Sequence, residues 1–427
     1  MKNVFVLVCF MFLIHDSYAQ SLLDVYKKGV VKLTPDMEYA QGNQWDKVFE
    51  TYYDETYGNR KSIIVTPDGS VVVNHPGSHF YSLFDANGKF VKEFVVAGKE
   101  RSGGQRNRTE AIAGVINNNF FAAPDQLGKM LCFDFDGNFV KTLTLDYMTR
   151  QVIPMNNNKI AVVGWVIWKD RFRDFVAIVD YQTNEEKIIW DQFSENSIMG
   201  NSRQLFNYTY RFGVRERIVV LSTMPYSGIT GISSPPQIAF VNNRLVVGLP
   251  HSGEILTFDA NGRMLSKEKI EWGKNYISVE EQKEIQKRAI ETMSKRDNLI
   301  VTTSLSQEEL RIENIKAREY FLSQMEADLN RITTPIPIPI FSNMIKDSDG
   351  NLLFFEMPAQ AGANRFNVWI YRDGGKFEGQ SSFVCDDYDL SITPSKMVFH
   401  NGYIYALQTL KNANGNPLRL VRFKLSN

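Results

Sequence analysis

One pattern constrains the fold of this chain more than any other: a short apolar run, an Asp-Gly or Asn-Gly turn, and a second apolar run. It occurs as SLFDANGKFVKEF from Ser82, as LCFDFDGNFVKTL from Leu131 and as LTFDANGRMLSKE from Leu256. Short runs rich in Val, Ile and Phe that are separated by such turns are typical of β-hairpins. The sequence therefore predicts repeated antiparallel strands.

Each copy belongs to a longer unit with four apolar runs. The first unit reads KSIIVTP, SVVVN, FYSLFD and KFVKEFVV, with turn or loop residues between the runs. The equivalent residues Phe84, Phe133 and Val179 are 49 and 46 residues apart. Four strands per unit at such a period indicate a β-propeller, in which each unit forms one blade. Six clear units predict an all-β, six-bladed fold.

Two of the turns imitate a calcium-binding loop. DFDGN (134–138) and DSDGN (347–351) match the start of an EF-hand loop, but its twelfth position requires Glu, and this chain has Leu145 and Pro358 there. Both segments also fall where the repeat requires a hairpin. We therefore predict turns and not calcium sites, with positive φ at both central residues, as two-residue hairpin turns require.

The segment NNNFFAAPDQLGKMLCFDFDGNFVKTL resembles the NHL repeat, in which a strand, a short loop and the pattern F-D-x-x-G-x-F follow one another. Over about residues 60–426, the chain resembles the secreted six-bladed NHL-like or TolB-like propellers of Bacteroidetes. The resemblance implies a bacterial propeller. It does not imply one activity, because such propellers include binding proteins, lyases and hydrolases.

The beginning of the chain predicts export. Residues 1–19 have the features of a secretory signal peptide: a positive residue, an apolar run (4–14) and a small residue, Ala19, at the cleavage site. The run is too short to span a bilayer, so we expect no integral membrane segment after cleavage and a periplasmic or extracellular location. Residues 20–60 are expected to lead into the propeller, which occupies 61–426.

The charge balance excludes some classes of partner. Lys plus Arg and Asp plus Glu are both 48, so no global field favours nucleic acid or an anionic membrane. No run combines basic residues with stacking aromatics, which also argues against nucleic acid. The two cysteines outside the signal peptide, Cys132 and Cys385, lie in apolar runs and are predicted to be buried free thiols.

Two segments interrupt the repeat. Residues 193–231 contain two apolar runs without an Asp-Gly hairpin, so they could form a degenerate seventh blade or a long hairpin excursion, and the six clear units favour the excursion. Residues 277–333 predict a helical insertion, because SVEE (278–281) and LSQEEL (305–310) contain capping boxes.

The second helix of this insertion should run to about Arg331. The insertion should pack on the propeller by an apolar stripe, or serve as a lid or as a partner-docking element, the last of which would suit a structural envelope component. The expected stripe consists of Ile312, Ile315, Leu322 and Leu329.

Propeller geometry separates two faces. When the strands of a blade are named a to d from the centre outward, the a–b and c–d turns lie on one face, which we name the turn face. The b–c and d–a connections lie on the other, which we name the loop face. Long, variable loops gather on the loop face, where function usually resides. The helical insertion is a d–a connection and should overhang it.

The loop face contains the candidate ligand-binding residues. Exposed aromatic planes stack on sugars or peptide side chains, and Arg binds carboxylates bidentately. Arginine and tryptophan side chains gathered on this face therefore predict a protein that binds a polar or anionic partner, either a glycan or a protein. Trp165 is a weaker candidate, because it should point away from the side that Trp168 faces. The predicted set is Arg101, Arg106, Trp168, Arg171, Arg173 and Arg365.

Three histidines on the same face provide the alternative. If His75, His79 and His251 converged, they could hold zinc. Such a site would resemble that of the amidating lyases, which share a six-bladed propeller. Calcium is the other metal that the sequence allows. No Walker loop or GxSxG elbow is present, and no motif places a nucleophile or carboxylate beside the histidines. A binding protein without a cofactor is the main prediction, and a metal-dependent lyase or hydrolase is the alternative.

Overall fold

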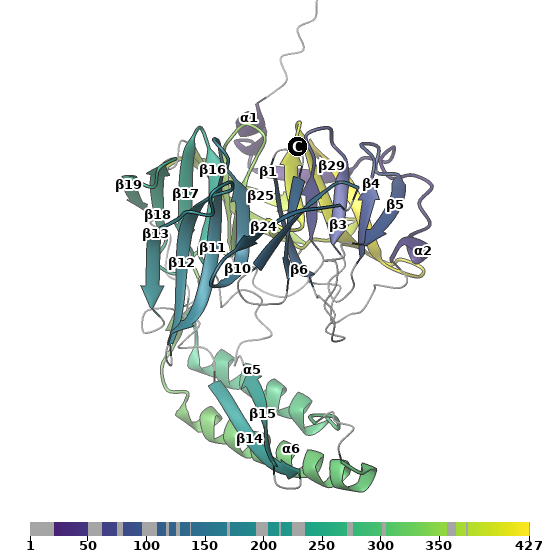
Figure 1. The fold of residues 1–427 in the computed structure, drawn as a ribbon, viewed down its shortest axis with the longest axis vertical. Coiled ribbons are helices and arrows are strands. Elements are labelled where there is room, and N and C mark those ends of the chain that lie inside the picture. The colour runs from purple at the N-terminus through teal and green to yellow at the C-terminus, as the bar shows by residue number, and fades with distance from the viewer. Residues whose placement is uncertain are drawn as a thin grey trace, which may run out of the picture.

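The computed structural model describes residues 21–49, 62–74, 80–95, 109–116, 119–124, 129–136, 138–168, 171–193, 204–212, 215–223, 235–270, 276–300, 305–337, 339–356, 364–372 and 375–426. Within these residues the protein is mostly β-structure with few helices. Figure 1 shows a body of sheets, with two long helices and a hairpin beyond it. The predicted signal peptide, 1–19, lies outside the described residues.

Four antiparallel sheets of four strands each follow one another along the chain (Figure 1). In each sheet the strands pair in chain order, which confirms the predicted four-stranded unit. The strands are β2 (Ile63–Val65), β3 (Val71–Asn74), β4 (Phe80–Phe84) and β5 (Phe90–Val95); β6 (Thr109–Ile116), β7 (Asn119–Pro124), β8 (Lys129–Asp134) and β9 (Phe139–Thr144); β10 (Met148–Pro154), β11 (Lys159–Trp168), β12 (Arg171–Asp180) and β13 (Glu186–Phe193); β16 (Gln237–Val241), β17 (Arg244–Leu249), β18 (Glu254–Asp259) and β19 (Met264–Lys269).

A nine-stranded sheet joins the two ends of the chain. The N-terminal strand β1 pairs in parallel with β25 and antiparallel with β29, where Leu33 lies opposite Leu425. The expectation that residues 20–60 lead into the propeller does not include this pairing, since β1 and β29 are at opposite ends of the sequence. The strands are β22 (Asn343–Lys346), β23 (Leu352–Phe355), β24 (Arg365–Arg372), β25 (Lys376–Val384), β1 (Val30–Pro35), β29 (Leu418–Ser426), β28 (Tyr403–Leu410), β27 (Met397–His400) and β26 (Tyr388–Asp389).

A buried ion pair, which we name the terminal clasp, holds β1 to β29. Asp36 accepts hydrogen bonds from Arg422 Nε at 3.1 Å and Nη2 at 2.7 Å, and Lys424 Nζ lies 3.1 Å from its carboxylate. Burial alone would raise the pKa of Asp36, but the hydrogen bonds from Arg422 and Lys424 hold that pKa below its usual range. The Arg422 guanidinium also lies over the rings of Tyr39 and Tyr403, at 4.7 and 4.6 Å.

Helix α1 (Leu22–Tyr26) covers the DSDGN turn between β22 and β23. Leu22 N donates to Asp349 Oδ2 at 2.8 Å, and the Tyr26 hydroxyl donates to Asp347 Oδ2 at 3.0 Å. Asp347 also accepts from the backbone and side-chain nitrogens of Asn351, both at 2.8 Å. Burial raises the pKa of Asp347 despite these bonds. Its carboxylate oxygens therefore bind protein N–H and O–H groups, as a turn requires.

Three turns between the outer two strands of a sheet are built in the same way. Asp85 Oδ1 accepts from Asn87 N and Lys89 N, both at 2.9 Å. Asp134 and Asp259 accept from the backbone N–H groups two and four residues ahead in their own turns. The carboxylates of these aspartates thus close hairpins, which confirms the prediction of turns.

The backbone of these turns differs from the prediction, however. Gly88 and Gly262 have positive φ angles of 75° and 74°, but the asparagines before them do not, and the strand register shifts beside each turn. The expected two-residue turn is wrong here, because the aspartate reaches four residues ahead and favours a longer turn with a glycine bulge. Paired positive φ angles, 48° and 60°, occur at the inner turn of Asn242 and Asn243.

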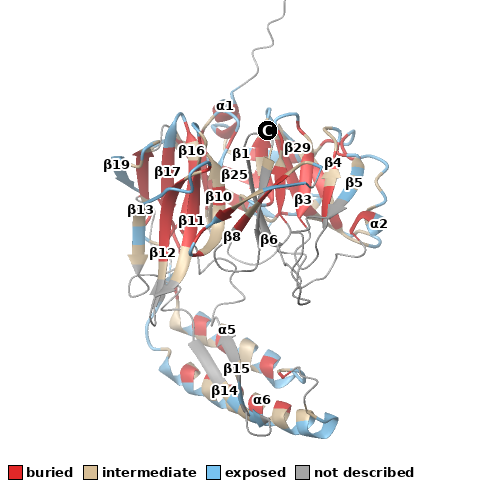
Figure 2. Ribbon diagram, viewed as in Figure 1, coloured by how far each residue is buried: buried red, intermediate tan, exposed pale blue. Residues whose placement is uncertain are grey.

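Apolar side chains fill the space between neighbouring sheets, where Figure 2 shows the buried residues concentrated. Trp45 of the short helix α2 (Trp45–Phe49) joins one of these clusters and lies 6.3 Å from the Phe84 ring. Cys132 and Cys385 are buried free thiols, as predicted, and burial raises the pKa of both. The sheets are therefore held together mainly by side-chain packing and not by shared hydrogen bonds.

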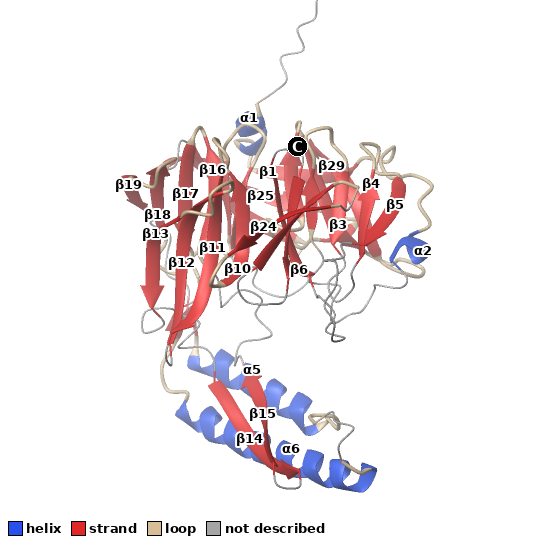
Figure 3. Ribbon diagram, in the orientation of Figure 1, coloured by secondary structure: helices blue, strands red, loops and turns tan. Residues whose placement is uncertain are grey.

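The two segments that interrupt the repeat come together in space (Figure 3). β14 (Gln204–Phe212) and β15 (Arg215–Thr223) form a two-stranded sheet of their own, so the described part of this segment is a hairpin and not a four-stranded unit. The hairpin packs on α6 (Gln307–Arg331), which pairs with α5 (Val279–Ser294). We name residues 204–223 with 276–331 the helix–hairpin module.

Short strands β20 (Tyr276–Ile277) and β21 (Ile336–Pro337) pair at the base of this module. Figure 1 shows the module beyond the ends of the sheets where β11 leads to β12, which is the loop face. None of the described helices combines the length and the apolar character needed to cross a membrane.

Both predicted capping boxes form, at Ser278 and Ser306, and α6 ends at Arg331 as expected. The predicted stripe on α6 is right only in part. Leu322 packs against the module's apolar cluster, but the Ile312 side chain is exposed, and the buried residues are Asn314, Ala317, Phe321, Met325 and Asp328. The apolar pattern did not predict this face because one of its buried residues, Asn314, is polar. The Asn314 amide oxygen accepts from the backbone N–H groups of Leu299 and Ile300, both at 2.7 Å, and so fixes the connection between the helices.

Candidate binding site

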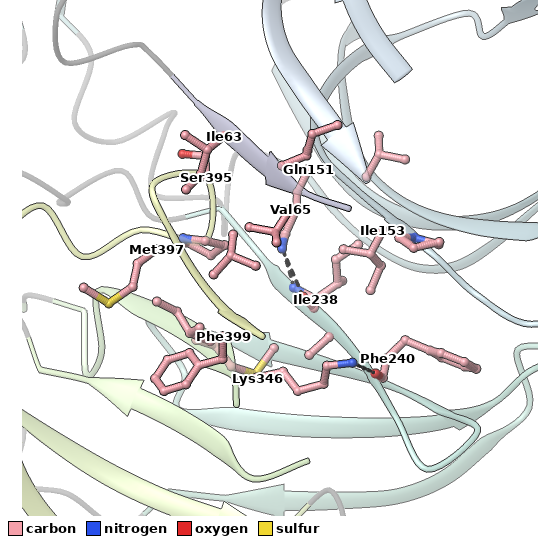
Figure 4. Close-up of a pocket in the computed structure, with 18 of the residues that line it drawn as sticks. Ile63, Val65, Gln151, Ile153, Ile238, Phe240, Lys346, Ser395, Met397 and Phe399 are labelled. Carbon is pink, nitrogen blue, oxygen red and sulfur yellow. Dashed lines mark hydrogen bonds between the residues drawn. The ribbon is translucent and has the colours of Figure 1, made fainter. Parts of the chain in front are cut away.

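The inner strands of the sheets surround a cavity of about 630 Å³ (Figure 4). β2, β10, β16, β22 and β27 supply its lining, and β6 contacts both β2 and β10. These strands begin on the loop face and end on the turn face, so the cavity has one end near each face. Most of the lining is apolar, and the polar lining residues are Thr149, Arg150, Gln151, Lys346, Ser395 and His400.

Two lining side chains bridge neighbouring sheets. Gln151 Nε2 donates to Ile238 O and its Oε1 accepts from Ile238 N, both at 3.0 Å. Lys346 Nζ donates to Phe240 O at 3.1 Å (Figure 4). These bonds satisfy backbone groups at the open edge of β16, which would otherwise lack partners. The wall of the cavity is thereby fixed on both sides of β16.

Lys346 is the cationic residue at the turn-face end. Its side chain is exposed, but the protein around it desolvates the ammonium group and lowers the pKa of Lys346, with Asp347 acting in the opposite direction. At the same end, His400 Nε2 lies 3.0 Å from the Asn401 amide nitrogen.

An arginine, an aspartate and an indole meet at the loop-face end. Arg150 Nε lies 3.9 Å from Asp174 Oδ1, and the guanidinium lies 5.2 Å from the centre of the Trp165 ring. Asp174 is almost fully buried, so the pair is shielded from water. Trp165, a weaker sequence candidate, therefore packs against a charged partner within its own sheet.

Two members of the predicted binding set lie at loop-face ends of strands. Arg173, near the start of β12, donates to Asp191 Oδ2 from Nε at 2.8 Å, and its Nη2 lies 2.6 Å from the same oxygen. Arg365 opens β24 and donates to Ser382 Oγ at 3.3 Å. The two arginines belong to different sheets, and both are held by hydrogen bonds.

The other four members are described less fully or not at all. Trp168 and Arg171 lie directly opposite each other in the β11–β12 ladder, which places their backbones at the loop-face end. Arg101 and Arg106 lie outside the described residues. The prediction that all six bind one ligand therefore stays a prediction.

The loop face also contains a carboxylate that sequence reasoning missed. Glu356, just after β23, accepts from Trp369 Nε1 and from Asn367 Nδ2, both at 2.9 Å. Ser382 Oγ donates to Asn367 Oδ1 at 2.8 Å and accepts from Arg365. Glu356 and Arg365 are thus the two ends of one hydrogen-bonded chain in this sheet.

The three candidate metal ligands cannot be brought together from the described residues. His251 lies in the connection between β17 and β18, whereas His75 and His79 lie outside the described residues. In the part of the chain that the structure describes, no three His, Cys, Asp or Glu side chains are grouped to hold a metal ion. The histidine site stays a prediction.

No family model matches the sequence, and no curated protein matches it. In structure the chain is similar to a member of the DUF4221 family from Bacteroides vulgatus, with 11% identity, a TM-score of 0.46 and coverage of 93% of this chain and 99% of that one. It is similar to a Bacteroides fragilis protein named for its expected export, with 12% identity, a TM-score of 0.47 and coverage of 93% and 95%.

A third similar structure is an inactive variant of virginiamycin B lyase from Staphylococcus aureus with quinupristin, at 11% identity, a TM-score of 0.38 and coverage of 86% and 96%. These proteins are β-propeller-like, and at such identities a likeness concerns the fold alone. Four-stranded antiparallel sheets, as in four of the described sheets, are the usual blade of a β-propeller.

Lys346 and Arg150 were missed for a physical reason. Sequence reasoning looked for chemistry in long loops, whereas these residues lie on inner strands. One signal was available for Lys346: it ends the run SNMIK directly before the DSDGN turn, so a lysine had to lie at the end of an inner strand.

Proposed function

We propose that the protein is an exported six-bladed β-propeller of the NHL-like or TolB-like type that binds a polar or anionic partner, a glycan or a protein surface, through its loop face. The blade count is supported by six groups of four strands. Four groups are separate sheets, and the nine-stranded sheet contains β22 to β25 and the group β27, β28, β29 and β1. In the last group the N-terminal strand supplies the outermost strand.

The observation that carries the binding function is the fixed position of two loop-face arginines. Arg173 is held by Asp191 and Arg365 by Ser382, so neither has to be ordered when a partner binds. A guanidinium has five N–H donors in a planar arrangement, which suits a carboxylate or another anionic group. The proposed binding set is Arg101, Arg106, Trp168, Arg171, Arg173 and Arg365.

The test is a binding screen of residues 20–427 against uronic-acid oligosaccharides, their neutral hexose counterparts and acidic peptides. With the best ligand of that screen, the double variant Arg171→Glu/Arg173→Glu should lose about tenfold or more in affinity, the cost of one or two charge-assisted hydrogen bonds. Arg263→Glu is the matched control, because this exposed arginine also lies near an aspartate, at 3.5 Å, but on the turn face. Equal affinity of the double variant and the wild type would refute the proposed site.

A metal-dependent lyase or hydrolase that uses His75, His79 and His251 is the alternative. The two classes differ in metal content, which a melting experiment with a chelator separates.

A further inference from the structure

The central cavity has the size and surface of a small-molecule site. Its volume of about 630 Å³ falls within the range of roughly 300–1,000 Å³ that is usual for ligand pockets. Apolar side chains such as Ile64, Ile238, Met344 and Val398 form its wall. Water beside such groups finds few hydrogen-bond partners, so a molecule with an apolar body would gain free energy by displacing it.

Lys346 contributes a positive charge that no side chain in the described part of the chain balances by an ion pair. Its Nζ donates one hydrogen bond, to Phe240 O, and within the described residues no carboxylate lies at ion-pair distance from it. An ammonium group has three donors, so two remain for a ligand. The adjacent Asp347 does not take them, because its oxygens bind Asn351 and Tyr26 in the turn.

The rest of the described lining does not compensate for this charge. It includes no aspartate or glutamate. Arg150, at the other end, has Asp174 beside it and therefore adds little net charge. Among the described lining residues, a ligand in the cavity thus meets a largely apolar wall and one cation without an ion-pair partner, near the turn face.

We propose that the cavity binds a small amphipathic carboxylate, with the carboxylate on Lys346 Nζ and the apolar body along the wall toward Ile64 and Ile238. One unbalanced charge suits a monoanion, whereas a phosphate dianion would bring a second buried charge without a partner. This site is distinct from the loop-face site, and it does not depend on the proposed binding of a glycan or protein.

Calorimetric titration of residues 20–427 with decanoate and with decanol at pH 7 tests the proposal. Decanoate should bind about tenfold or more tightly than decanol, which shares the chain but not the charge. Lys346→Met should abolish this preference while leaving decanol affinity unchanged. Lys187→Met is the matched control: Lys187 also donates to a backbone carbonyl, Asn261 O at 2.7 Å, but lies outside the cavity.

A second readout is proton uptake on decanoate binding, which is measured on the wild type and so does not depend on how a variant folds. Because burial lowers the pKa of Lys346 and a bound carboxylate would raise it, decanoate binding near that pKa should take up protons. The binding enthalpy should therefore vary with the ionisation enthalpy of the buffer, and this dependence should vanish in Lys346→Met.

The outcomes separate the two proposals. Equal affinities for decanoate and decanol, an unchanged decanoate affinity in Lys346→Met, or no binding of either probe would each overturn the cavity site. Arg171→Glu/Arg173→Glu should keep full decanoate affinity, and a loss there would also contradict a separate cavity site. Failure of the loop-face variants in the glycan screen would leave the cavity result standing.

Discussion

The sheets around the cavity and the helix–hairpin module differ in the number of buried apolar side chains that the structure describes in them. Among the described residues, one cluster between two sheets contains 11 buried residues, including Phe258, whereas the module's cluster contains five, including Phe321. Stability against local opening follows the amount of apolar surface buried. The module should therefore be the first part of the protein to open.

The two regions also differ in how the chain reaches them. Within each four-stranded sheet, paired strands follow one another in sequence. The module joins 204–223 to 276–331, with β16 to β19 lying between them, and the terminal clasp joins β1 to β29. Contacts between distant segments cost more chain entropy to form. We therefore expect the sheets to form first and the module and the terminal clasp to assemble later.

The largest effect is expected from Phe321→Ala. Removing a fully buried phenylalanine costs about 3–5 kcal/mol, which a core of this size cannot offset. The module should lose protection from hydrogen exchange while the sheets keep theirs. Phe258→Ala, at an equally buried position between sheets, is the matched comparison and should lower the melting temperature of the whole molecule. A single cooperative loss in both variants would mean that the module is not a separate unit.

A somewhat smaller effect is expected from Asp36→Asn in the terminal clasp. Leaving Arg422 without its buried partner should lower the free energy of unfolding by about 3 kcal/mol. The exposed pair Lys32–Asp386, 2.7 Å apart, is the control, and Lys32→Ala should lower the free energy of unfolding much less, because water screens the pair. Because the folded pKa of Asp36 is lowered, its contribution is present at neutral pH and is lost as the pH falls below about 4. A variant difference that persists unchanged at pH 3 would contradict this account.

Lys396 lies just before β27, and removing its charge should raise the free energy of unfolding. Burial lowers its pKa to about 8, and no described carboxylate pairs with it. The unfolded chain therefore binds more protons between that pH and the usual lysine pKa of about 10.4, so the wild-type free energy of unfolding should rise over this range. Lys396→Met should lack the rise and should be more stable at pH 7 by up to about 3 kcal/mol. A loss of stability at pH 7 would show a role for the charge.

The smallest effect is expected from EDTA. The described turn aspartates bind their own backbone N–H groups, so the chelator should leave the melting temperature unchanged. A reversible drop of several degrees would instead indicate a bound metal and support the histidine site. The measurement compares scans with and without EDTA, and then with zinc or calcium restored.

Sequence patterns predicted the features that depend on near neighbours. The turn at Asp134, the capping boxes at Ser278 and Ser306 and the four-stranded unit all follow from interactions within a few residues. The pairing of β1 with β29 could not be predicted in this way, because its strands have no shared local signal.

The candidate site was predicted less well than the fold. Arg173 and Arg365 were placed on the correct ends of their strands, since strand order decides which loops share a face. Lys346 was missed because its importance depends on which strands surround it and on the absence of a described acidic partner. The apolar stripe predicted for α6 does not include Asn314, because a hydrophobic pattern cannot show that a polar side chain is buried to bind backbone N–H groups.

Hydrogen–deuterium exchange of the mature chain, followed by mass spectrometry, tests the central claim most directly. We expect residues 204–223 and 276–331 to exchange together and faster than the sheets. We also expect β1 to be protected as strongly as β29. Exchange of 204–223 together with β16 to β19 and apart from the helices would contradict a separate module. Rapid exchange of β1 beside a protected β29 would contradict the pairing that joins the two ends of the chain.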